Sequence, residues 1–109
     1  MKKLLLAGII TLLAASLSAR AAEAKDNYEQ SCQKCHGADG KGATKMGQRL
    51  GCKDYTDPKV QAALKDDEAI KAIKEGFKDA DGKTIMKGYD ALSDDEVKAL
   101  VAYMRTFKP

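Results

Sequence analysis

The sequence is poor in the residues on which most enzymes and many small secreted domains depend. It has no tryptophan, one histidine and three cysteines among its 109 residues. A single histidine leaves no second imidazole to act as a general base, and no Ser/His/acid or metalloprotease motif is present. Three cysteines allow at most one internal disulfide, so a multiple-disulfide framework is excluded. We therefore expect that the chain is not an enzyme, and that something other than disulfides completes a small core.

The start of the chain has the pattern of a secretory signal peptide. Two lysines precede an apolar run over residues 4–17, which is shorter than the roughly 20 residues that a membrane-spanning helix needs. Residues 19–21 read Ala-Arg-Ala and fit the A-x-A pattern of a cleavage site. We expect a signal peptide over residues 1–21, with a second possible cut that would make the mature chain begin at Lys25 instead of Ala22.

Removal of this segment changes the charge of the protein. Three of the 19 basic residues and none of the 16 acidic residues lie in it, which leaves 16 of each sign in residues 22–109. The near-zero net charge of this single expected domain gives no support to nucleic-acid binding. The sequence predicts a periplasmic or otherwise secreted protein, without stable membrane insertion after cleavage.

Helix start and stop signals predict an all-α domain of about four short helices. The starts are Asp26 with Glu29, Asp57 with Pro58, Asp66, and Ser93 with Glu96. The last helix carries one apolar stripe, formed by Val97, Leu100, Val101 and Met104. Glycines crowd residues 37–51 too densely for a helix interior. The one β-like segment, residues 83–86, is expected to be too short to pair.

The segment "SCQKCHGADGKG", residues 31–42, holds two cysteines and the only histidine. On a helix Cys32, Cys35 and His36 project from one face within about one turn. Two thiols can then add to the two vinyl groups on one edge of a porphyrin, with the imidazole under the iron. The spacing C-x-x-C-H is the signature of c-type haem attachment.

Two other chemistries use such a cluster. A redox dithiol expects a βαβ setting, for which the chain has no strands. A zinc site could use Cys32, Cys35, His36 and Cys52, the ligand count of a structural Cys₃His site. Adjacent Cys35 and His36 would then have to bind one small ion together, which tetrahedral sites rarely require. A zinc-stapled interaction module stays a remote alternative.

The sequence resembles the small single-haem cytochromes c of the His/Met type over most of residues 24–107. The resemblance rests on "CQKCH", "KTIMKGYDALSDDE" and "LVAYMRTF". It implies a small cytochrome c fold, in which helices wrap around one covalently attached haem c and the N- and C-terminal helices cross. Tyr28 resembles the family's aromatic on the first helix, and Tyr103 the one that packs against it. A glycine is common at that crossing, where this chain has Ala24.

The resemblance also implies the ligands of the haem iron. Cys32 and Cys35 would form the thioethers, and His36 and Met86 would be the axial ligands. A methionine ligand favours ferrous iron and raises the reduction potential. Met46, in the loop after the histidine, and Met104, on the apolar stripe, are the other methionines after the signal peptide.

The surroundings of these ligands are less clearly marked. The family usually fixes the histidine ring through a carbonyl of a proline-containing loop, and residues 37–57 contain no proline. Arg49 and Lys53 are candidate donors to the haem propionates, and Tyr55 and Tyr89 are candidates for the haem wall; solvated or ordinary packing roles remain open. Cys52 would be a shielded free thiol or form an intermolecular disulfide.

The resemblance implies a one-electron carrier that docks transiently to redox partner proteins and acts as a monomer. Basic residues surround the haem motif and could form a positive rim, or be scattered and solvated: Lys34, Lys41, Lys45, Arg49 and Lys53. An open sixth position would instead imply a haem-based ligand sensor or minor peroxidase.

Overall fold

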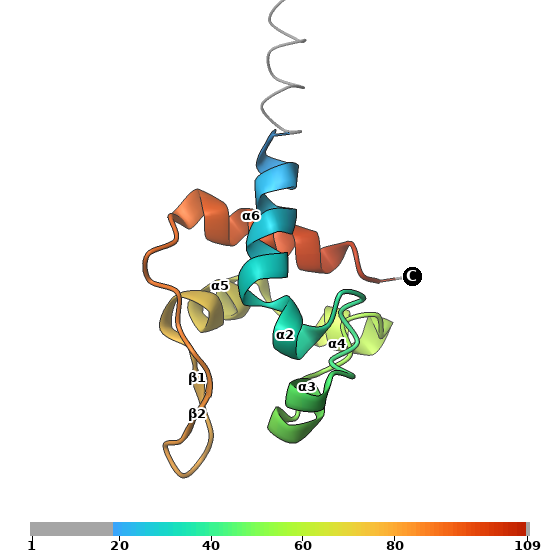
Figure 1. Ribbon diagram of the computed structural model, residues 1–109, viewed down its shortest axis with the longest axis vertical. Coiled ribbons are helices and arrows are strands. Elements are labelled where there is room, and N and C mark those ends of the chain that lie inside the picture. Colours follow the sequence, from blue (N-terminus) through green and yellow to red (C-terminus); the bar gives the residue numbers. More distant parts are fainter. Residues whose placement is uncertain (1–18, 109) are drawn as a thin grey trace, which may run out of the picture.

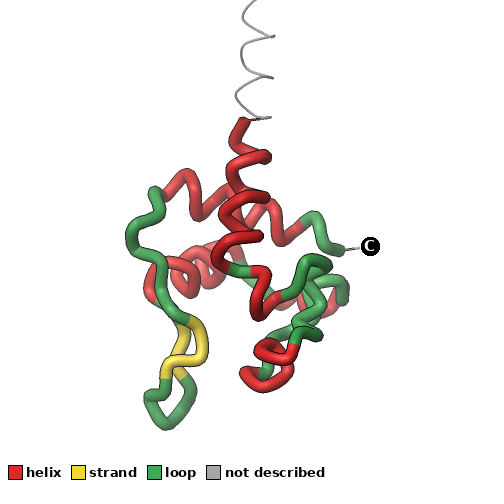
Figure 2. The backbone as a smooth tube through the Cα atoms, viewed as in Figure 1, coloured by secondary structure: helices red, strands yellow, loops and turns green. Residues whose placement is uncertain are grey.

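The computed structural model describes residues 19–108, which form a mainly helical domain with one short hairpin (Figure 2). The first helix occupies residues 19–31 of the described chain. The elements after it are α2 (Gln33–His36), α3 (Lys45–Leu50), α4 (Pro58–Ala63), α5 (Asp66–Glu75), β1 (Phe77–Lys78), β2 (Thr84–Met86) and α6 (Asp94–Arg105). The all-α prediction is confirmed for the fold class. All but the last three residues of the predicted signal peptide lie outside the described residues, and no helix within residues 19–108 is long and apolar enough to cross a membrane.

The first helix and α6 cross (Figure 1). Aromatic side chains fill the crossing. The ring centroid of Tyr28 lies 5.0 Å from that of Tyr103 and 5.3 Å from that of Phe107. The crossing and the Tyr28–Tyr103 contact expected from the resemblance are therefore confirmed. Ala24 is 2% exposed, so the methyl group that stands in place of the common glycine is packed into the core.

A small apolar core joins the first helix, α5 and α6. Its buried members among the described residues are Ala24, Tyr28, Ala69, Ile73, Val97, Leu100 and Val101. The last three belong to the predicted stripe on α6, and the fourth stripe residue, Met104, is partly buried against them. The core is limited to this region, and α2, α3 and α4 contribute no apolar side chain to its fully buried part.

Two of the predicted helix starts are confirmed in detail. The Ser93 hydroxyl accepts a bond from the Glu96 N–H at 3.1 Å, and the Glu96 carboxylate accepts one from the Ser93 N–H at 3.0 Å. The Asp57 carboxylate accepts the Lys59 N–H at 2.9 Å, with Pro58 as the first helical residue. These bonds satisfy N–H groups that a helix leaves without intrahelical partners.

Two other predicted starts are wrong. The first helix passes through Asp26 without interruption, because the alanine-rich residues before it are good helix formers. Asp66 is the first residue of α5, and the N-cap is Lys65, which makes no side-chain capping bond. The carboxylate of Asp66 lies in the acidic first turn, where it still complements the helix dipole.

The glycine-rich segment contains a helix that the sequence analysis did not expect. Helix α3 includes Gly47, and a Cβ at this position would collide with the carbonyl oxygens of Cys35 and Gly42. Glycine therefore permits α3 to lie directly against the backbone of α2. The hydroxyl of Thr44 caps α3 by accepting the Gly47 N–H at 2.9 Å.

The prediction that residues 83–86 would not pair is also wrong. β1 and β2 form an antiparallel hairpin, with Phe77 opposite Met86. The Asp79 carboxylate accepts the N–H groups of Asp81 at 3.0 Å and Lys83 at 2.9 Å, and these bonds stabilise the turn. The hairpin extends away from the helices (Figure 1).

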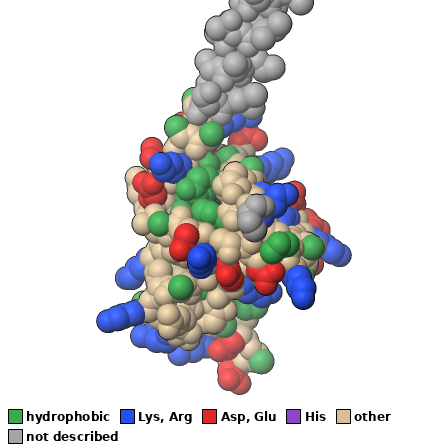
Figure 3. Space-filling view, turned by 90° about the vertical axis from the view of Figure 1, so that its right-hand side faces the viewer, with side chains coloured by type: hydrophobic (Ala, Val, Ile, Leu, Met, Phe, Trp, Pro, Cys, Tyr) green, Lys and Arg blue, Asp and Glu red, His purple; other side chains and the backbone are tan. Residues whose placement is uncertain are grey.

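Charges of both signs are interspersed on the molecular surface. In the face shown in Figure 3, lysine and arginine side chains alternate with aspartate and glutamate, and apolar side chains gather near the described start of the chain.

Candidate functional site

A mainly apolar pocket lies beside the core and contains most of the predicted site residues. Its lining consists of Tyr28, Cys32, His36, Tyr55, Ala69, Ala72, Ile73, Met86, Leu100 and Met104. The free space in the pocket, including its opening to solvent, is about 430 Å³. The lining comes from both ends of the chain and from α5 and the hairpin between them, so the pocket exists only in the folded domain.

Backbone hydrogen bonds between residues four apart position Cys32 and His36 at the pocket. The Cys32 N–H donates to the Tyr28 carbonyl at 2.8 Å, and the His36 N–H donates to the Cys32 carbonyl at 3.0 Å. These bonds hold Cys32 and His36 one turn apart, as the sequence spacing predicts. Cys35 is partly buried on α2 beside His36 but does not belong to the lining of the pocket.

The imidazole of His36 is half-buried and incompletely satisfied. Its buried Nδ1 atom has no hydrogen-bond partner, and the Tyr55 ring lies 5.6 Å away between centroids. Burial lowers the pKa of His36 below its usual value, so the ring is neutral at pH 7. Neutral imidazole is the form that binds metals. The sequence offered no proline-loop carbonyl for this ring, and no residue of the described chain replaces it.

Two of the methionines face the same pocket as His36. Met86 lies at the end of β2 and Met104 on α6, and both line the pocket. Met46 is on α3 and is not part of the lining. The fold therefore excludes Met46 from the pocket and leaves Met86 and Met104 as thioethers near the imidazole.

The thiols are shielded rather than activated. Burial, and secondly the neighbouring Cys35, raise the pKa of Cys32 to about 11. The same two causes raise the pKa of Cys52. The three cysteines form no disulfide. Within residues 19–108 no group of three or more His, Cys, Asp or Glu side chains could hold a metal ion, which argues against a Cys₃His zinc site.

The other predicted residues divide between the pocket and the surface. Tyr55 lines the pocket, and burial raises the pKa of its hydroxyl. Tyr89 does not line it; its hydroxyl donates to the Ser31 carbonyl at 3.0 Å and ties the loop after β2 to the first helix. Arg49 and Lys53 are exposed.

The sequence analysis missed residues that shape the pocket from outside the motif. Ala69 and Ala72 line it from α5, and their spacing with Ile73, at i, i+3 and i+4, was a readable signal. Gln61, 7% exposed, donates to the carbonyls of Tyr55 at 2.7 Å and Met104 at 3.0 Å. No local pattern marks Gln61, because its partners are distant in the sequence.

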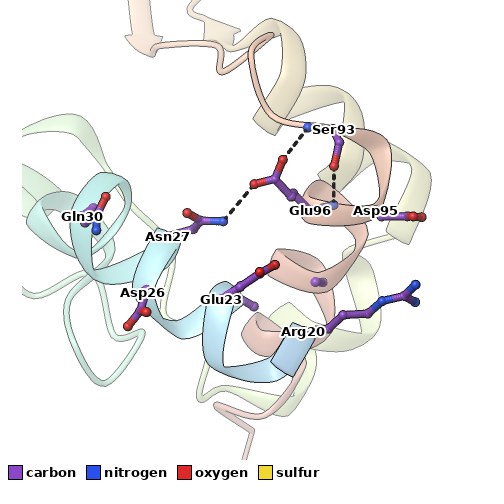
Figure 4. Close-up of a pocket in the computed structure, with 10 residues that line it drawn as sticks. Arg20, Glu23, Asp26, Asn27, Gln30, Ser93, Asp95 and Glu96 are labelled. Atoms are coloured by element: carbon purple, nitrogen blue, oxygen red, sulfur yellow. Dashed lines mark hydrogen bonds between the residues drawn. The ribbon is translucent and has the colours of Figure 1, made fainter. Parts of the chain in front are cut away.

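A larger hollow lies between the first helix and the start of α6, with about 1160 Å³ of free space when its opening to solvent is included. Figure 4 shows that polar and charged side chains surround it, among them Arg20, Glu23, Asn27 and Glu96. Its lining contains neither a cysteine nor the histidine nor a methionine. The predicted chemistry is therefore located in the smaller apolar pocket.

The smaller pocket fits a haem bound through thioethers. Among its lining residues, one thiol of the motif, a neutral imidazole and two methionine sulfurs meet against apolar walls. Imidazole and thioether sulfur are the iron ligands of haem in cytochromes c, and the second thiol, that of Cys35, lies beside His36 on α2.

Comparisons with known proteins agree with this fit. The sequence model of the family described as Cytochrome c matches residues 21–108. A solved structure, "KustC0563 c-type cytochrome", is 36% identical with a TM-score of 0.67, covering 78% of this chain and 96% of that one. A solved structure of a mutant of Kustc0563 is 34% identical with a TM-score of 0.66, covering 79% and 99%. No curated protein matches the chain. The chain belongs to the cytochrome c family, whose members are electron-transfer proteins with covalently bound haem c.

Proposed function

We propose that this chain is an exported carrier of single electrons that holds one haem c. Residues 1–21 act as the signal peptide, and residues 22–109 form the mature domain, periplasmic or otherwise secreted. The apolar run and the A-x-A site support export. The size of the domain and its single C-x-x-C-H motif support one haem.

In this proposal Cys32 and Cys35 hold the haem as thioethers, and His36 and Met86 are its axial ligands. The observation that carries it is the meeting of Cys32 and His36, from one short motif, with Met86, from the distant strand β2, in one apolar pocket. Both methionines pack against the core. Met86 is preferred to Met104 because it lies at the end of β2 and leads into an irregular loop, whereas Met104 belongs to the apolar stripe of the regular helix α6.

The bound haem supplies a one-electron couple, and the protein supplies a rigid, dry setting for it. Ala69, Ile73 and Leu100 line the pocket with apolar groups that exclude water. Tyr55 packs near the His36 ring. Because both ligands stay bound in the two oxidation states, no substrate site is needed, and we propose no enzymatic activity.

Transient redox partners would dock against the exposed basic residues near the motif. Lys34, Lys41, Lys45, Arg49 and Lys53 all have exposed side chains. Turnover with a partner reductase or oxidase would then slow as ionic strength rises and after charge reversal at these positions. Turnover that is insensitive to both changes would contradict this docking surface.

The ligand assignment is tested by visible spectroscopy of the holoprotein made in cells with haem-attachment machinery. The oxidised wild type should show the weak far-red band of methionine bound to low-spin iron. The band should vanish in Met86→Ala and persist in Met104→Ala, a matched control from the same pocket. The reverse pattern would assign Met104. High-spin bands that shift with carbon monoxide in the wild type would mean a ligand sensor or peroxidase, and a spectrum without haem would refute the proposed function.

A further inference from the structure

The backbone carbonyls of the residue before His36 and the residue after it each accept a hydrogen bond from a side-chain hydroxyl. The Thr44 hydroxyl donates to the carbonyl of Cys35, the residue before the histidine, at 2.8 Å. The Tyr28 hydroxyl donates to the carbonyl of Gly37, the residue after it, at 2.5 Å. One donor comes from the loop before α3 and the other from the first helix. Two separate elements therefore hold the backbone before and after His36 by hydrogen bonds.

Both donors are themselves firmly placed. Tyr28 is 1% exposed and packs between Tyr103 and Phe107. The Thr44 hydroxyl also accepts the Gly47 N–H at 2.9 Å, so it links the Cys35 carbonyl to the first turn of α3. Neither hydroxyl is free to turn away without losing a buried or partly buried bond.

These two backbone hydrogen bonds are important because no hydrogen bond holds the ring of His36 itself. Its buried Nδ1 has no hydrogen-bond partner among residues 19–108, whereas a ligand histidine usually donates this N–H to a carbonyl or carboxylate that fixes the ring. Gly37 has φ of +83°, a conformation accessible to glycine, which permits more backbone freedom after the histidine than another residue would. The orientation of the ring must then depend on its backbone.

We propose that Tyr28 and Thr44 are positioning residues for His36, and that their hydroxyl groups replace the missing ring hydrogen bond by fixing the backbone carbonyls of the residues before and after it. The inference rests on the proposed function, because it takes His36 as the iron ligand. Tyr28 has a second role here besides its aromatic packing at the helix crossing: the packing needs its ring, and the positioning needs its oxygen.

The two roles are separated by substitutions in the holoprotein. Tyr28→Phe keeps the ring and removes the oxygen, and Thr44→Val keeps the shape and removes the donor. Tyr103→Phe is the matched control, since the Tyr103 hydroxyl makes no hydrogen bond within residues 19–108 and the ring belongs to the same cluster. Thr44→Ser restores a hydroxyl. The measurements are the midpoint reduction potential and the paramagnetic proton NMR shifts of the His36 ring in the oxidised protein.

We expect Tyr28→Phe and Thr44→Val each to change the ratio of oxidised to reduced protein at a fixed potential at least twofold, which corresponds to a shift of the midpoint potential by about 18 mV for a one-electron couple. Each should also move the NMR resonances of the His36 ring. Tyr103→Phe and Thr44→Ser should stay within that limit. Unchanged potentials and shifts in both test variants, with a wild type that has histidine ligation, would overturn this inference alone. A change in only one variant would overturn the paired assignment. A wild type without histidine ligation would overturn the proposed function and this inference with it.

Discussion

Replacing Arg105 with alanine is expected to destabilise the protein by about 2–4 kcal/mol. The guanidinium donates to the Gln61 carbonyl at 2.8 Å, to the Gln61 side-chain oxygen at 2.9 Å and to the Leu64 carbonyl at 2.6 Å. Three such bonds contribute about 0.5–1.5 kcal/mol each. The substitution also leaves the side-chain oxygen of Gln61, a buried residue, without this donor, which adds to the cost.

The ion pair of Arg105 is expected to contribute much less than these bonds. Its partner Asp66, at 2.6 Å, has a side chain that is 70% exposed, and exposed pairs contribute about 0–1 kcal/mol. Asp66→Asn is therefore the matched control: it removes the charge and keeps an oxygen acceptor. Arg105→Lys keeps the charge and loses the planar guanidinium group. The stability that it loses should therefore lie between the losses in Asp66→Asn and Arg105→Ala.

Urea unfolding of the holoprotein, followed by far-UV circular dichroism, measures these differences. With a slope of roughly 1 kcal/mol per molar urea for a domain of this size, the midpoint for Arg105→Ala should fall by about 2–4 M. A decrease of the midpoint by less than about 1 M would refute the estimate from the hydrogen bonds. An equal fall in Asp66→Asn would show that the ion pair dominates.

Three further predictions concern a close backbone approach and the two residues of a helix cap. Gly47→Ala gains up to about 1 kcal/mol of helix propensity. The new methyl group collides with the carbonyls of Cys35 and Gly42, which costs about 1–3 kcal/mol. Because this cost is the larger of the two, the melting temperature should fall. Ser93→Ala should cost about 1 kcal/mol in urea unfolding. Hydrogen bonds from Ser93 hold the pKa of Glu96 below its usual 4.5, so the Glu96 carboxylate stabilises the fold above pH 4.5 and loses this effect as the pH falls through its lowered pKa. The stability difference between wild type and Glu96→Gln should narrow in that acidic range.

The sequence predicted those features that are encoded by neighbouring residues. The cap formed by Ser93 with Glu96, and the cap of Asp57 with Pro58, are complete within four residues. The spacing of Cys32 and His36 likewise needs only one helical turn. Such features depend on local backbone geometry, which a short stretch of sequence determines.

The features that the sequence did not predict depend on contacts between distant residues. Helix α3 exists despite its glycine because that glycine packs against α2. Gln61 is buried through a partner 43 positions away on α6. Tertiary packing overrides local propensity at both places. The hairpin is different, because its turn is closed by local bonds of Asp79 that the sequence analysis did not use.

The resemblance added what local patterns could not supply. It implied the crossing of the first and last helices and the contact of Tyr28 with Tyr103, both of which the structure confirms. It also singled out Met86, which lines the pocket together with Met104. Neither the local patterns nor the resemblance predicted the hydrogen bond that the Tyr28 hydroxyl donates, because a phenylalanine would make the same packing contacts.

The burial of Ala24 distinguishes the two possible ends of signal-peptide processing. Its neighbours Ala22 and Glu23 are exposed, whereas Ala24 is 2% exposed at the crossing of the first helix with α6. A mature chain that begins at Ala22 keeps this residue, and one that begins at Lys25 loses its methyl group from the core, at about 0.8 kcal/mol. In the proposed processing, a cut after Ala21 would therefore remove only exposed residues of the first helix, while a cut three residues later would remove part of the interior of the domain.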